Sequence, residues 1–286
     1  MPQHAVFLIA AADRKGLLAE TTRFFYQRDF NILHCQQYTD VMDGSYFMRI
    51  KVDLADMSMT RRVLEEEFAE LGRTMNFTFR VYYLDAVSRM AIMVSRTSHC
   101  LYDLLVRRED GDLACEIPLI ISNHPDLESV ADRFQVPFYC FPLAKGEDKA
   151  AQEHAVMELC DHHHIDLVVL ARYMQVVSDR FIEHFHGNVI NIHHAFLPAF
   201  QGGNPYRRAW ERGVKMIGAT AHYATADLDE GPIIEQDVER VTHEDSPDAM
   251  RQTGKDIERR VLTRAVRAHL EHRVILAGRR TIVFKG

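Results

Sequence analysis

The sequence lacks any run of apolar residues close to the roughly 20 that a membrane helix needs. Its start, MPQHAVFLIAAADRKG, carries its charges after a short apolar run, whereas a secretory signal peptide carries them before one. Cysteines are few, odd in number and without a CxxC pair, which excludes a disulfide framework and is typical of reduced thiols. We therefore expect a cytoplasmic protein that neither spans a membrane nor is secreted.

Common nucleotide and zinc motifs are also missing, since there is no GxGxxG, no GxxxxGKS or GxxxxGKT and no HExxH. Positive charge is in deficit: 34 Lys and Arg against 41 Asp and Glu give a net charge of −7, which repels nucleic acid and anionic lipid. We therefore expect no nucleic-acid and no membrane partner. The composition is that of a globular protein, 47% hydrophobic and 26% charged, and a length of 286 residues favours two domains.

The first 86 residues show the pattern of a small α/β domain. A hairpin signal at Asp43-Gly44 separates two apolar segments, and apolar residues at helical spacing indicate two helices. Ser58 is a capping residue type, and we expect it to cap the second helix. The expected elements are a strand at 4–11, a helix from Leu17, strands at 31–38 and 45–53, a helix over Val63 to Leu71 and a strand at 77–84. The order βαββαβ predicts a ferredoxin-like fold for residues 1–86.

The turn Asp13-Arg14-Lys15-Gly16 before the first helix, with Asn31-Ile32 after it, resembles an ACT domain. ACT domains often pair edge to edge and hold a small amino acid near this loop. The resemblance implies an amino-acid effector bound by Asp13, Gly16 and Asn31, and a homo-oligomer, either a dimer or a tetramer. A packing module without a ligand is the other interpretation, in which Gly16 only begins a helix where the backbone approaches closely. Both interpretations stay open.

From residue 87 onward, strands and helices alternate. Strands are expected near 90–94, 117–122, 136–142 and 165–170, and helices near 98–108, 126–134 and 147–163. Alternation predicts a Rossmann-like, mostly parallel sheet with helices on both faces and a ligand beyond the carboxyl ends of its strands. The segment from Ser95 to Ser98 is interpreted as an N-cap, with an anion site as the alternative. We assign residues 87–286 to this second domain.

Asn191 and His193 stand two residues apart in an apolar segment, so on a strand their side chains share a face. An amide and an imidazole at a strand end are donors suited to an oxyanion on an attacked carbonyl. A strand over 216–224 contains His222, and a carboxylate-rich turn follows it. If the Asp229 of this turn lies near His193, the two can share a proton transfer. An ordinary solvated turn accounts for the same spacing, so spacing alone leaves the function open.

Four segments together resemble the catalytic domain of the folate-dependent formyltransferases: Asn191-Ile-His193, Phe196-Leu-Pro198, Gly218-Ala-Thr-Ala-His222 and Asp227-Leu-Asp229-Glu-Gly-Pro232. In that family an Asn, a His two residues later and an Asp in the later turn carry formyl transfer, and they match Asn191, His193 and Asp229. An ACT-like unit followed directly by such a domain is the arrangement of the formyltetrahydrofolate deformylase family. Departures from the family pattern at Ala195 and at Gly202-Gly203 concern pocket detail only.

The resemblance implies hydrolysis of 10-formyltetrahydrofolate to formate and tetrahydrofolate, which supplies formate for purine synthesis and balances the one-carbon folate pool. Water held by Asp229 attacks the formyl carbon, Asn191 and His193 stabilise the oxyanion, and His193 protonates N10. The folate is the substrate, and the resemblance implies no cofactor and no metal ion.

Substrate-binding residues are also implied by the resemblance: Arg172, Met174, Val176, His222, Thr225 and Asp227. Arg172 either meets folate carboxylates or forms a salt bridge that holds its loop, and packing is the alternative for Met174 and Val176. His194 is expected to point away from His193 on a continuing strand.

Three other functions compete with this one. The 16 histidines could build a metal-dependent amidohydrolase, although no ligand motif is present. A formyltransferase acting on an amine acceptor is the second. One that acts on tRNA would need a basic C-terminal module, whereas the remaining residues indicate only a helix at about 246–271 and a hairpin turning at 277–279. The third is an amino-acid sensor without catalysis, which would not need Asn191, His193 and Asp229 together.

Overall fold

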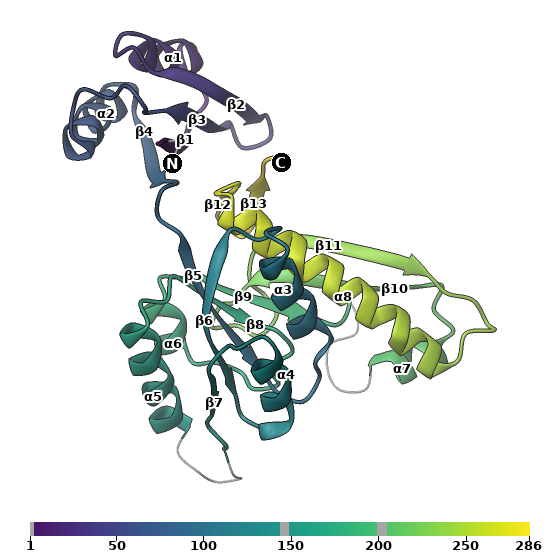
Figure 1. The fold of residues 1–286 in the computed structure, drawn as a ribbon. Coiled ribbons are helices and arrows are strands. Elements are labelled where there is room, and N and C mark those ends of the chain that lie inside the picture. Colours follow the sequence, from purple (N-terminus) through teal and green to yellow (C-terminus); the bar gives the residue numbers. More distant parts are fainter. Residues whose placement is uncertain (1–2, 144–148, 199–204) are drawn as a thin grey trace. The chain divides into compact units, whose positions relative to one another are not determined.

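The computed structural model describes residues 3–143, 149–198 and 205–286, and the chain divides into two compact units (Figure 1). Unit 1 runs to Val87 and includes Glu271–Ala277 and Ile282–Gly286, whereas unit 2 comprises Ser88–Leu270 and Gly278–Thr281. That residues 1–86 and 87–286 each fold as an independent domain stays a prediction. Within the described ranges, no helix is both long enough and apolar enough to cross a membrane.

Unit 1 is built on a four-stranded antiparallel sheet in the order β2-β3-β1-β4 (Figure 1). Its elements are β1 (His4–Ala12), α1 (Leu17–Tyr26), β2 (Asn31–Asp40), β3 (Ser45–Asp53), α2 (Arg61–Met75) and β4 (Phe77–Tyr83). The predicted βαββαβ order and ferredoxin-like fold are confirmed. Aromatic rings fill the core between this sheet and its helices, because Phe7 of β1 contacts Phe25 of α1 and Phe68 of α2 at ring-centroid distances of 4.9 and 4.8 Å.

The opposite face of this sheet is covered by residues of 271–277 and 282–286. Val6 and Leu8 alternate with Phe7 along β1 and therefore point away from the two helices. They form an apolar cluster with Ile275 and Phe284, from the hairpin of β12 (Val274–Ala277) and β13 (Arg280–Val283) and the residue after it. The hairpin is where the sequence predicts one, but its association with the N-terminal sheet is a finding of the structure.

Two local predictions in unit 1 are corrected. Thr60, not Ser58, is the N-cap of α2, and its hydroxyl accepts a hydrogen bond from the Val63 N–H at 3.3 Å. Met57 and Met59 pack against the core, and Thr60 itself has the extended backbone that is typical of an N-cap residue. Gly16 does begin α1, but with φ of 95°, a left-handed conformation that favours glycine, and a Cβ there would meet nothing closer than 3.9 Å. Its conformation, and not a close approach, accounts for the glycine.

Unit 2 contains a seven-stranded sheet in the order β11-β10-β9-β8-β5-β6-β7. Five strands run parallel: β5 (Ser88–Val94), β6 (Cys115–Ser122), β7 (Phe138–Cys140), β8 (Leu167–Leu170) and β9 (Val189–His193). Strands β10 (Met216–Tyr223) and β11 (Ile233–Arg240) are antiparallel to their neighbours. The predicted mostly parallel sheet is confirmed, and its central strand β8 is buried along its whole length.

Helices cover both faces of this sheet (Figure 1). One side carries α3 (His99–Glu109) and α8 (Pro247–Leu270), and the other carries α5 (Lys149–His162) and α6 (Asp179–His184). The short elements η1 (Pro125–Leu127), α4 (Glu128–Arg133) and α7 (Pro205–Arg212) complete the unit. The strand order reverses between β5 and β8, because the chain adds β6 and β7 on one side and β8 and β9 on the other. Such a reversal is where sheets of this kind bind ligands.

Candidate active site

A cavity of about 290 Å³ lies at the carboxyl ends of β8 and β9, next to the reversal of strand order. Its walls come from the segment after β8 (172–177), the end of β9 (191–194), His222 of β10 and the turn that carries Thr225, Leu228 and Asp229. The sequence places the candidate catalytic residues at strand ends, and sheet topology places the ligand at the same edge. The cavity therefore brings together residues that lie up to 59 positions apart, from Leu170 to Asp229.

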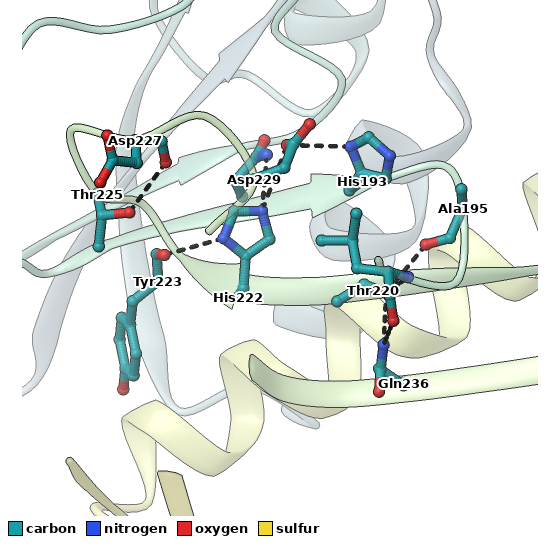
Figure 2. Close-up of polar contacts among 11 residues, drawn as sticks. His193, Ala195, Thr220, His222, Tyr223, Thr225, Asp227, Asp229 and Gln236 are labelled. Atoms are coloured by element: carbon teal, nitrogen blue, oxygen red, sulfur yellow. Dashed lines mark hydrogen bonds and ion pairs between the residues drawn. The ribbon is translucent and has the colours of Figure 1, made fainter. Parts of the chain in front are cut away.

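Asp229 and His193 form a buried ion pair (Figure 2). Nδ1 of His193 lies 3.0 Å from Oδ1 of Asp229, and their side chains are 7% and 8% exposed. A carboxylate only accepts hydrogen bonds, so Nδ1 carries a hydrogen. Nε2 of the same ring is buried and has no hydrogen-bond partner within the described part of the chain. This nitrogen is therefore available to a bound ligand.

His222 connects Asn191 to the backbone of β10. The antiparallel register sets His222 directly opposite Asn191, and Asn191 Nδ2 lies 3.2 Å from His222 Nε2. Nδ1 of His222 lies 2.9 Å from the main-chain oxygen of Tyr223, which can only accept (Figure 2). Nδ1 therefore carries a hydrogen, and Nε2 faces both the Asn191 amide and Oδ1 of Asp229, which lies 3.8 Å away. The second hydrogen of that amide is left for a ligand.

The turn that carries Asp229 lies against β10. Asp229 has φ of 60°, a left-handed conformation that aspartate tolerates better than most residues. Two residues later, a Cβ added to Gly231 would lie only 1.7 Å from the main-chain oxygen of Tyr223. The Tyr223 N–H in turn donates to the carbonyl of Pro232 at 3.0 Å. Only glycine allows the turn to come this close, and this contact sets the position of Asp229.

Asp229 keeps its negative charge throughout the neutral pH range. Burial raises the pKa of its carboxyl, but the hydrogen bonds and charges of His193 and His222 outweigh burial and lower the pKa well below its usual value. A carboxylate with a low pKa is a weak proton acceptor. The geometry therefore suits Asp229 to orienting its neighbours and stabilising positive charge.

Thr220 of β10 fixes the loop that follows His193. Its hydroxyl donates to the carbonyl of Ala195 at 2.9 Å and accepts from the Leu197 N–H at 3.0 Å (Figure 2). The side-chain amide of Gln236 donates to the same hydroxyl at 2.9 Å. Thr220 lies in the segment 218–222 that carries part of the family resemblance, but nothing in the spacing of the sequence indicates which carbonyl it meets.

The segment after β8 is tied to β5 and β6 through a buried serine. The hydroxyl of Ser95 accepts from the Met174 N–H at 3.0 Å and donates to Oδ1 of Asn123 at 2.7 Å. Ser98 stands at the N-cap of α3, as predicted for this segment, but its side chain makes no capping hydrogen bond. Ser95 therefore holds a wall of the cavity.

The predicted substrate-binding residues that line the cavity are Arg172, Met174, Val176, His222 and Thr225. Met174 and Val176 are 60% and 52% exposed, so core packing does not account for them. Asp227 is not among the lining residues; its main-chain oxygen accepts from the Thr225 hydroxyl at 3.0 Å and shapes the turn. Gly202 and Gly203 lie outside the described residues.

His194 does not point away from His193, and that expectation is wrong. The two rings stack at a centroid distance of 4.9 Å and an angle of 15°, and both line the cavity. Strand β9 ends at His193, so the alternation of side chains ends there too.

The predicted effector residues all belong to unit 1. Asp13 is exposed and its N–H donates to the carbonyl of Gly44 at 2.6 Å, Gly16 begins α1, and Asn31 opens β2 with an exposed side chain. Their role in binding an amino acid stays a prediction.

Comparison with known proteins agrees with this fold and geometry. The model of the formyl transferase family matches residues 88–266, more than half of the chain, so the chain belongs to that family. A curated formyltetrahydrofolate deformylase from Synechocystis sp. is 50% identical over 280 residues, which cover 98% of either chain. A crystal structure of a formyltetrahydrofolate deformylase from Pseudomonas syringae pv. tomato has a TM-score of 0.95 and 40% identity, and covers 100% of this chain and 95% of that one. Within the larger family, the chain is a member of the formyltetrahydrofolate deformylases, which are hydrolases.

A third relative shares the fold over only part of this chain. Glycinamide ribonucleotide transformylase 1 from Symbiobacterium toebii is 31% identical with a TM-score of 0.67, and covers 71% of this chain and 97% of that one. The family and the enzyme class expected from the sequence are confirmed by the full-length relatives, and transfer to an amine acceptor is not favoured by them.

Proposed function

We propose that this chain hydrolyses the N10-formyl group of 10-formyltetrahydrofolate to formate and tetrahydrofolate in the cavity lined by Asn191, His193 and Asp229. The observation that carries the proposal is the buried pair of Asp229 and His193, with Nδ1 of the ring used by Asp229 and Nε2 unpartnered among the described residues. An imidazole fixed through one nitrogen and open at the other is arranged to exchange a proton with a ligand.

Asp229 orients the attacking water. Oδ1 of its carboxylate meets His193, and we assign the other carboxylate oxygen to a hydrogen bond from the water. Because the pKa of Asp229 is lowered, the carboxylate stays charged and stabilises the imidazolium of His193 next to it. The low pKa supports a role for Asp229 in orienting the water, and not in accepting its proton.

The reaction balances with His193 as the proton carrier. The water oxygen bonds to the formyl carbon, and the carbonyl electrons form an oxyanion that the free Asn191 N–H stabilises together with His193. The bond from carbon to N10 then breaks, and N10 takes a proton from Nε2 of His193. One proton of the water restores the imidazolium of His193, and the other leaves with formic acid, which releases it to solvent and becomes formate. His222 acts indirectly, because it holds the Asn191 amide at 3.2 Å.

Several finer assignments belong to the same proposal. Arg172, Met174, Val176 and Thr225 bind the folate, Asp227 shapes the turn beside it, and no metal ion or cofactor takes part. Formate from the reaction feeds purine synthesis, and the reaction adjusts the one-carbon folate pool. An amino acid that binds at Asp13, Gly16 and Asn31 regulates turnover in a homo-oligomer. A cytoplasmic location stays a prediction.

Formate release from 10-formyltetrahydrofolate, measured without an added acceptor and with a chelator present, tests the main proposal. We expect formate from the natural chain, and a loss of release in both Asp229→Asn and His193→Ala. Formyl transfer that needs an added amine would assign the chain to the transferases, and inhibition by the chelator would indicate a metal-dependent hydrolase.

A further inference from the structure

A second buried charged group, apart from the pair of Asp229 and His193, lies in unit 2. Glu258 in the middle of α8 is 1% exposed. Its carboxylate accepts from the Tyr206 hydroxyl at 2.8 Å and meets Nε2 of His99 at 2.7 Å, and Nε of Arg172 lies 3.5 Å away. We call His99, Arg172, Tyr206 and Glu258 the Glu258 cluster.

The chain is shaped to build this cluster. A Cβ added to Gly254, one helical turn before Glu258, would lie 2.1 Å from the Tyr206 hydroxyl, so the absence of a side chain there lets the hydroxyl reach the carboxylate. Burial raises the pKa of Glu258, but His99, Arg172 and Tyr206 outweigh burial and lower it. The carboxylate is therefore charged at neutral pH, and a buried charge of this kind destabilises the fold unless it is well paired.

Arg172 connects the cluster to the cavity, since it lines the cavity together with Asn191 and His193. Its backbone has φ of 66°, a conformation uncommon for a residue with a side chain. Its Nε and Nη1 atoms are buried, and no acceptor among the described residues forms a hydrogen bond with them. The contact with Glu258 is thus a charge contact that leaves most of the five N–H donors of the guanidinium for another partner.

Buried donors without a partner destabilise the folded chain, and more so when the group is charged. Nε and Nη1 have no accessible surface of their own, but 16% of the Arg172 side chain stays accessible, and a ligand with oxygen acceptors that enters the cavity reaches the guanidinium from that side. A carbonyl or a carboxylate has the required chemistry, and a planar guanidinium donates to either with two parallel hydrogen bonds.

We propose that Glu258 is a positioning residue, which holds the Arg172 guanidinium at the cavity wall so that it receives an oxygen acceptor of the substrate. The inference rests on the proposed function for the identity of the substrate as a folate. His99 and Tyr206 do not contact the substrate or hold Arg172 directly. They fix the Glu258 carboxylate, which in turn holds Arg172.

A metal ion is a weaker explanation of the same cluster. His99, Cys100 and Glu258 offer ligand atoms within 4.8 Å of one another. However, the positively charged Arg172 guanidinium already lies 3.5 Å from the carboxylate, and it would repel a metal cation bound at the same place. Burial also raises the pKa of the Cys100 thiol, which opposes formation of the thiolate that metals bind.

The test compares Arg172→Ala, Glu258→Gln and the double variant, with Glu211→Gln as the matched control. Glu211 pairs with Arg207 at 3.0 Å on the exposed face of α7, outside the cluster. Steady-state kinetics with 10-formyltetrahydrofolate gives KM and kcat, and calorimetric titration with tetrahydrofolate gives Kd without turnover. We expect Arg172→Ala to raise KM and Kd on the order of 10- to 100-fold, the loss of charge-assisted hydrogen bonds.

Non-additivity is the decisive readout. If Glu258 acts through Arg172, Glu258→Gln raises KM and Kd in the natural background but adds nothing when Arg172 is already alanine. Effects that multiply in the double variant, or a change in Tm with an unchanged KM, would overturn the inference. If Glu258→Gln does not fold, Tyr206→Phe loosens the same carboxylate and is judged by the same criterion.

A substrate without the glutamyl group, 10-formyltetrahydropteroate, separates the two sources of the acceptor. Loss of the Arg172→Ala effect with this substrate assigns Arg172 to the glutamyl group, and persistence assigns it to an acceptor that the pteroate keeps, on the pterin, the formyl group or the benzoyl carbon. A natural chain that binds tetrahydrofolate but releases no formate refutes the proposed hydrolysis alone. Formate release with multiplying effects refutes the positioning role alone.

Discussion

Replacing Gly231 with alanine tests whether the position of Asp229 is set by backbone contact. The added Cβ would lie 1.7 Å from the Tyr223 oxygen, and an ordinary contact begins near 3.4 Å, so the turn must move by about 1.7 Å. Asp229 is two residues away, and its 3.0 Å contact with His193 cannot survive a shift of that size. A displacement of about 1 Å at a reacting group costs on the order of 100-fold in rate, which is about 2.7 kcal/mol of activation free energy.

The assay is kcat for formate release, with Tm measured on the same samples. We expect Gly231→Ala to fold and to lose roughly 100-fold in kcat. Gly111→Ala is the control: Gly111 has φ of 79° and open space around it, so the change strains only a loop and costs about 1 kcal/mol of stability without changing kcat. A Gly231→Ala variant that keeps kcat within threefold of the natural chain would refute the reasoning, because Asp229 would then tolerate a moved turn.

Further expectations concern the reacting groups and pH. Asp229→Asn should lower kcat by about 1,000-fold or more with a smaller change in KM. If kcat falls and KM rises by the same factor, Asp229 does not act mainly on the transition state. Asn191→Ala should cost about 100- to 1,000-fold in kcat, and full activity would remove it from the oxyanion site. Burial lowers the pKa of His269 from 6.5 to about 4, so between these values the unfolded chain binds a proton that the folded chain does not. Stability should therefore fall as pH drops from 6.5 to 4, by up to about 3 kcal/mol, and urea midpoints that decline equally in His269→Asn would show that another group is responsible.

The sequence was sufficient for the order of elements and for the face shared by Asn191 and His193. Period-two alternation places both side chains on one side of β9, and apolar strands between helices predict the parallel sheet. The edge where the cavity lies follows from the same rule of topology.

Contacts between distant segments could not be read from the sequence. Asp229 reaches His193 because β10 pairs antiparallel with β9 and the turn after β10 folds back onto β10. Neither the pairing of the two strands nor the path of the turn can be read from the spacing of residues along the sequence. The Glu258 cluster draws on four segments, and Glu258 alone resembles any charged residue of an amphipathic helix. The orientation of His194 depends on where β9 ends, which its neighbouring strands decide, and Ser58 is one of two capping residue types close to the start of α2.

The hairpin that covers the back of the N-terminal sheet has a consequence for synthesis on the ribosome. Val6, Leu8 and Phe47 find their apolar partners Ile275 and Phe284 only after residues 88–270 of unit 2 have been translated. At 5–20 residues per second that interval is about 10–40 s, during which one face of the nascent sheet stays exposed to water or to a chaperone. Unit 1 is thus synthesised first but completed last. A chain interrupted before residue 271 would leave one apolar face of its N-terminal sheet exposed to solvent and prone to aggregation.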